Sequence, residues 1–196
     1  MAVELRKGQK VSLAKSAQIG EILINLNWTQ GIPKKTFFGG TKIQSIDLDL
    51  GAFVELADGR RFCVQALGNS FGSVDAEPYV MLDGDDRTGE AAGGENLRVN
   101  GRMLSNIKRM LVFTFIYEGI ASWQQADGVV TIKYPGGDDI IVKMDEYGSQ
   151  QKMCAIAAIV NNNGDLSVEK IVRFFDGHPQ MDNAFGWGFR WTAGSK

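Results

Sequence analysis

Acidic side chains gather at two places in the sequence where their spacing suits metal binding. Asp47 and Asp49 stand two residues apart in an alternating run, so both point to the face of a strand opposite its leucines. Two neighbouring carboxylates on one sheet face repel each other and need solvent or a cation between them. The second group is interleaved with glycine and comprises Asp83, Asp85, Asp86, Glu90 and Glu95.

Calcium is the ion that such a pattern fits. It takes about six to eight oxygen ligands, and glycines let backbone carbonyls turn toward it. An EF-hand is excluded, because a loop starting at Asp83 has Arg87 and Thr88 where that motif needs an acidic residue and a glycine. On spacing alone, a solvated surface loop remains the alternative.

Thiol and imidazole groups offer a second kind of chemistry. Cys63 and Cys154 lie in apolar surroundings, which favours buried and unreactive thiols. A catalytic thiol needs a histidine nearby, and His178 is the only one; nothing in the sequence links them. We predict a turn around His178. Phe185, Trp187, Phe189 and Trp191 predict core packing of a terminal strand, with a ligand-stacking platform as the alternative.

The elements that position these residues are predicted to be strands. Period-2 alternation over Ile22 to Trp28 and Ile46 to Leu56 places apolar side chains on one face. Ile107 to Tyr117 is apolar on both faces and predicts a central strand. Turn residues predict three hairpins, which pair 46–56 with 61–66, 129–134 with 140–144, and 153–160 with 166–175. Residues 155–160 are alanine-rich, so a short buried helix stays open there, and residues 122–126 favour one helical turn.

These strands indicate an all-β fold, a β-sandwich of two mainly antiparallel sheets with a long acidic loop. The chain has 196 residues, 44% hydrophobic and 22% charged, which is typical of a globular domain. Its net charge of −2 argues against nucleic-acid binding. No bilayer-length apolar run or secretory signal is visible, so we expect a cytoplasmic location.

Three motifs are Ile46-Asp47-Leu48-Asp49 with Gly84-Asp85-Asp86-Arg87-Thr88-Gly89-Glu90, the opening Leu5 to Leu13, and Asn25-Leu26-Asn27-Trp28. In their order along the chain they resemble motifs of the TerD family of bacterial tellurium-resistance and stress proteins. The C-terminal half, from Met153-Cys154-Ala155-Ile156 to Phe185-Gly186-Trp187-Gly188-Phe189, looks closer to the TerA-type branch.

The resemblance implies a single TerD-like domain over residues 1–196 that is non-enzymatic and binds calcium. The implied ligands are Asp47, Asp49, Asp85, Asp86, Glu90 and Glu95. Ala91-Ala92 replaces acidic residues usual in the family, so we expect one calcium ion rather than two. Expected partners are other Ter-family proteins in a membrane-associated complex, without nucleic acid or direct membrane insertion. Two alternatives stay open: a metal-independent protein-interaction scaffold of a Ter-type complex, and an enzyme that acts on tellurite or another small oxyanion through a redox thiol or a bound cofactor.

Overall fold

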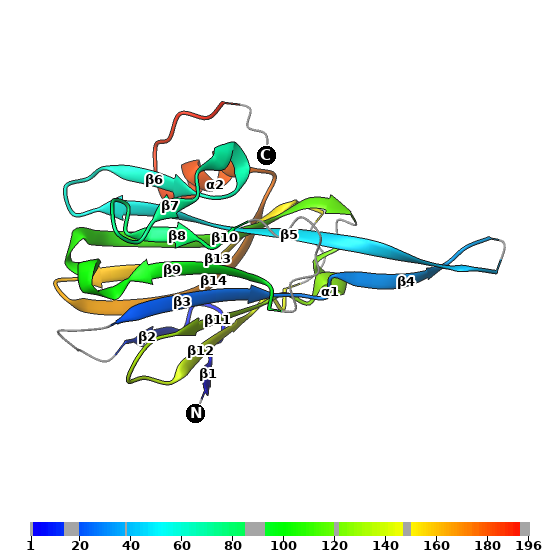
Figure 1. The fold of residues 1–196 in the computed structure, drawn as a ribbon, viewed down its shortest axis with the longest axis horizontal. Coiled ribbons are helices and arrows are strands. Elements are labelled where there is room, and N and C mark those ends of the chain that lie inside the picture. The colour runs from blue at the N-terminus through cyan, green and yellow to red at the C-terminus, as the bar shows by residue number, and fades with distance from the viewer. Residues whose placement is uncertain are drawn as a thin grey trace.

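The computed structural model is a β-sandwich (Figure 1). It describes residues 2–13, 20–37, 39–84, 93–119, 122–146 and 150–192. Within these residues two sheets of seven strands each face one another. The predicted all-β sandwich is confirmed.

The first sheet is antiparallel except at one edge, where β1 runs parallel to β12. Its β11–β12 hairpin is the one predicted from the turn at residues 135–138. In spatial order its strands are β1 (Ala2–Glu4), β12 (Asp139–Lys143), β11 (Val129–Lys133), β3 (Glu21–Asn27), β9 (Glu95–Asn100), β8 (Val80–Leu82) and β7 (Gly72–Ser73).

The second sheet is antiparallel and contains the longest strands. The predicted central strand, β10, lies between β5 and β13. The 153–160 segment is strand rather than helix, because it pairs with β10 on one side and β14 on the other. The strands in order are β2 (Lys10–Ser12), β14 (Asp165–Phe175), β13 (Met153–Asn162), β10 (Ile107–Gly119), β5 (Thr41–Leu56) and β4 (Gly31–Lys35), with β6 (Arg61–Val64) also paired to β5.

Helices are short in the described part of the chain: η1 (Leu67–Asn69), η2 (Gly101–Asn106), α1 (Trp123–Ala126) and α2 (His178–Phe185). The helical turn at α1 is confirmed. The turn predicted around His178 is wrong, because that residue begins α2. Pro179 fits the first turn of a helix, where an N–H is not needed, and Gly186 ends the helix at φ 65°.

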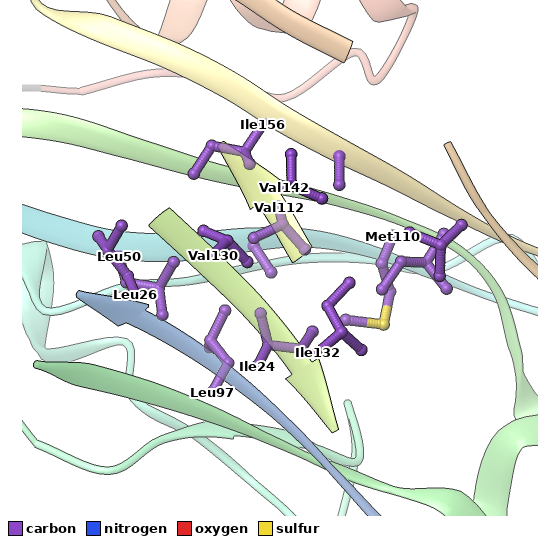
Figure 2. Close-up of a cluster of buried hydrophobic side chains, with 14 of the residues drawn as sticks. Ile24, Leu26, Leu50, Leu97, Met110, Val112, Val130, Ile132, Val142 and Ile156 are labelled. Carbon is purple, nitrogen blue, oxygen red and sulfur yellow. The ribbon is translucent and has the colours of Figure 1, made fainter. Parts of the chain in front are cut away.

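The main core fills the space between the sheets (Figure 2). Ile24, Leu26 and Val130 from the first sheet meet Leu50 and Val112 from the second, and all are buried. The alternation seen in the sequence therefore selects the inward face, so that Leu48 and Leu50 point into the sandwich.

A second apolar cluster covers the opposite face of the second sheet. Phe53 from β5 and Phe113 from β10 pack there with ring centroids 4.9 Å apart. Helix α2 and the segment after it supply Met181 and Trp187, which are also fully buried. The central parts of β5 and β10 are thus buried on both faces, which explains why the buried stretch Met110 to Ile116 of β10 is apolar except for Thr114.

Candidate metal centre

Strand β5 presents Asp47 and Asp49 on the face predicted from their spacing, away from the inter-sheet core. Asp47 is half-buried and Asp49 is fully buried. The pairing register places Asp49 opposite Phe115 and Asp47 opposite Glu118 of β10. Directly opposed like charges destabilise a sheet, and this register concentrates negative charge near the middle of β5, beside the C-terminal end of β10. The sequence analysis missed Glu118, whose position depends on a register that local alternation does not show.

Glu95 joins the first sheet to the acidic strand of the second. It begins β9, and its Oε2 accepts a hydrogen bond from the backbone N–H of Leu50 at 2.6 Å. That N–H belongs to the Asp49–Leu50 peptide, so the Glu95 carboxylate lies beside the acidic stretch of β5. Glu95 and Asp49 are both at most 3% exposed. Burial of two carboxylates is costly unless hydrogen bonds or cations compensate for the lost water.

The C-terminal end of the loop between β8 and β9 is fixed by backbone packing. Gly94 has φ +70°, and a Cβ built there would lie 2.0 Å from the carbonyl oxygen of Leu26. Only glycine permits that approach. The Asn25 side-chain amide donates to the Gly93 carbonyl at 2.6 Å. These contacts set the direction in which Glu95 enters the sandwich.

The N-terminal end of the same loop is held by an ion pair. Asp83 donates its backbone N–H to the Asn96 carbonyl at 2.9 Å, which continues the β8–β9 pairing. Its carboxylate accepts from Nε of Arg98 at 2.6 Å, and Arg98 also reaches Glu21. The Asp83 carboxylate is therefore paired with the guanidinium of Arg98, although its place in the acidic loop sequence suggested a metal ligand.

The structure describes half of the predicted ligand set. Asp47, Asp49 and Glu95 lie around one stretch of β5, whereas Asp85, Asp86 and Glu90 lie outside the described residues. Among the residues that are described, no three His, Cys, Asp or Glu side chains converge in a metal-ligating arrangement. Carboxylate oxygens are the ligand type that a hard cation such as calcium prefers.

Thiol catalysis finds no support in the geometry of the cysteines. Cys63 and His178 do line one pocket of about 480 Å³. Burial raises the pKa of the Cys63 thiol to about 12, and burial lowers the pKa of His178 to about 4. Both groups are neutral at pH 7, so no thiolate–imidazolium pair forms. Burial also raises the pKa of Cys154, which lies inside the core.

The segment that carries the C-terminal aromatic residues is held by the side chains of Asp182 and Arg109. The buried carboxylate of Asp182 accepts from the backbone N–H of Gly188 at 2.6 Å, that of Phe189 at 2.9 Å and Nε1 of Trp191 at 2.7 Å. The guanidinium of Arg109 lies 4.1 Å from the Trp187 ring centroid. Core packing is confirmed for Trp187, whereas Phe189 and Trp191 are half-buried and line the pocket that also holds Cys63 and His178. The prediction of a terminal strand is wrong, because no strand is formed over the described residues 187–192.

The described helices include none that is both long and apolar enough to cross a bilayer. Comparison with known proteins agrees with the motifs noted in the sequence. A family model described as "TerD domain" matches residues 1–165. The chain is also 52% identical over 188 residues to the tellurium resistance protein TerA of Alcaligenes sp.. This match covers 95% of the chain but 56% of that relative, so the chain spans about half the relative's length. The chain belongs to the TerD domain family.

Proposed function

We propose that this chain is a calcium-binding, non-enzymatic stress-response module of the tellurium-resistance type. One observation carries the proposal. The Glu95 carboxylate, at the end of the acidic loop, is hydrogen-bonded to the peptide that follows Asp49. The loop and the acidic strand, which are far apart in the sequence, are therefore anchored to the same point.

Charge supports a cation at this point. Asp47, Asp49 and Glu95 bring three carboxylates to one stretch of β5, and Glu118 lies opposite Asp47 in the register. A calcium ion between β5 and the loop would reduce the repulsion between these carboxylates, and Asp85, Asp86 and Glu90 of the loop would supply further ligands. One ion is proposed, because Ala91-Ala92 leaves few carboxylates for a second.

The wider role rests on the relative. The TerA protein of Alcaligenes sp. is named for tellurium resistance, and we extend that role to this chain. We further propose a cytoplasmic location and assembly with other Ter-family proteins. A non-enzymatic role agrees with the two protonated thiols, which lack the activation that covalent catalysis requires.

Calorimetric titration of chelator-stripped protein tests calcium binding. We expect one calcium per chain and weaker competition by magnesium, which demands a tighter octahedral site. Calcium should also raise the melting temperature, because a ligand at about a hundredfold excess over Kd stabilises the native state by about 2.7 kcal/mol.

Three variants locate the ion. Asp85→Ala and Asp86→Ala should each abolish the calcium response while the metal-free fold is retained. Asp176→Ala, an exposed acidic residue beyond β14, is the matched control and should respond like the wild type. If millimolar calcium gives no heat of binding and no change in melting temperature, the calcium proposal fails and the metal-independent scaffold is favoured. If both loop variants respond like the wild type, the ion binds elsewhere.

A further inference from the structure

A two-stranded ribbon extends beyond the sandwich at one end. Strand β4 pairs with the first residues of β5, from Gly31 opposite Ser45 to Lys35 opposite Thr41. Figure 1 shows these two strands running out together, past the other strands of their sheet. Every described residue from Pro33 to Ile43 in this ribbon is exposed. Its length is therefore not explained by packing on the sandwich.

The ribbon is strongly cationic. Residues 31–45 contain Lys34, Lys35 and Lys42 and no acidic residue. Lys34 lies directly opposite Lys42 in the register, so two positive charges share one face of a two-stranded sheet. Such a pair destabilises the ribbon unless an anion lies between the charges. The three lysines, with Thr36 and Gln44, line a shallow hollow of about 330 Å³.

The same ribbon exposes large apolar side chains. Phe37, at its tip, is 97% exposed, and Ile43 is 64% exposed. Among the described residues, the only other large hydrophobic side chain of this kind is Tyr117, at 39%. An aromatic residue at the tip of a lysine-bearing ribbon has the composition of an interfacial membrane anchor, in which apolar groups enter the headgroup boundary and lysines meet acidic lipids.

We propose that the β4–β5 ribbon docks on an anionic membrane surface, with Phe37 in the headgroup boundary and Lys34, Lys35 and Lys42 on acidic lipid headgroups. The contact is peripheral and needs no segment that crosses the bilayer. The three lysines match an acidic lipid surface in charge, and the exposed Phe37 and Ile43 match its apolar boundary.

Charge segregation in the chain favours one orientation on such a surface. The ribbon carries +3 and the whole chain −2, so the rest carries −5, the difference between the two. An anionic surface attracts the ribbon and repels the sandwich, which therefore points away from the lipid. The calcium site proposed above lies in the sandwich and is not required for this contact.

Co-sedimentation with vesicles tests the proposal on the full chain. Vesicles of phosphatidylcholine with about 30% phosphatidylglycerol should retain the protein at low salt, whereas pure phosphatidylcholine should not. Lys34→Gln with Lys42→Gln should weaken binding about 30-fold, because each lysine near the surface contributes about 1 kcal/mol. The matched control, Lys133→Gln with Lys152→Gln, changes two exposed lysines of the sandwich and should bind like the wild type.

A second variant reports on the tip itself. The emission that Phe37→Trp adds to that of the four native tryptophans, taken as the difference from the wild type, should be of the exposed type in solution and should shift to the blue with acidic vesicles, while the melting temperature is unchanged. The proposal is overturned if acidic vesicles do not bind the chain, if the control pair loses as much affinity as the ribbon pair, or if bound vesicles leave the fluorescence of the Phe37→Trp variant unchanged. If Lys34→Gln with Lys42→Gln alters self-association but not vesicle binding, the ribbon docks on protein and the proposal is also overturned.

Discussion

The hydrogen bond between the Glu95 carboxylate and the Leu50 amide can be removed in two ways that separate its geometry from its charge. Glu95→Ala deletes the acceptor and leaves the Leu50 N–H without its 2.6 Å partner in a buried position. An unsatisfied buried donor costs about 1 to 3 kcal/mol, so we expect a loss of about 2 kcal/mol in the free energy of unfolding. Glu95→Gln keeps an oxygen acceptor and should cost about 1 kcal/mol or less.

Thermal melting of metal-free protein measures the difference. For a chain of this size 1 kcal/mol corresponds to roughly 2 to 4 °C, so Glu95→Ala should melt roughly 4 to 8 °C below the wild type. Glu169→Ala, a half-buried glutamate of β14, serves as the control. Because Glu95 fixes one end of the loop, both Glu95 variants should also bind calcium more weakly. If Glu95→Ala melts with the wild type, the proposed anchoring of the loop to β5 is refuted.

Three further predictions concern the second apolar cluster and its neighbours. Burial lowers the pKa of His178 from 6.5 to about 4, so the unfolded chain takes up a proton at higher pH than the native chain. The free energy of unfolding should therefore fall by up to about 3 kcal/mol as the pH is lowered from 6.5 to 4. Melting curves over this pH range should lose that contribution in His178→Gln. Asp182→Ala removes three accepted hydrogen bonds and should lower the free energy of unfolding by about 3 kcal/mol or more. The near-ultraviolet circular dichroism of Trp191 should be lost, and an unchanged spectrum would contradict the role assigned to Asp182. Cys63 should resist thiol-specific reagents at pH 8 in the native protein and react after unfolding, because burial raises its pKa to about 12; rapid native modification would show an activated thiol.

Local patterns predicted most of the sheets. Alternation identified β5 and its inward leucines, because one face of that strand packs in the core. Turn residues identified the three hairpins, whose partners are neighbours in the sequence. Other strands, among them β1, β4, β7, β8 and β9, escaped prediction. Strand β4 contains Pro33, which is tolerated because the strand lies at a sheet edge. The parallel pairing of β1 with β12 joins distant segments and leaves no local signal.

The candidate site was predictable in its residue types but not in its geometry. The carboxylates of Asp47 and Asp49 were placed on the correct face by counting residues. The link from Glu95 to Leu50 crosses between sheets, and the pairing of Asp47 with Glu118 depends on the β5–β10 register; neither follows from spacing. Helix α2 was missed because it is short, although Pro179 and Gly186 mark its ends. The ligand roles of Asp85, Asp86 and Glu90 remain predictions.

The apolar cover on the outer face of the second sheet has a consequence for biosynthesis. Phe53, Phe113 and Phe115 are made early, whereas the segment that covers them begins at His178. Roughly 60 residues separate Phe115 from that helix, which at typical translation speeds is about 3 to 12 seconds of synthesis. During this interval the nascent chain contains the three phenylalanines but not the segment that covers them, so a chaperone that binds aromatic surfaces has a binding site there.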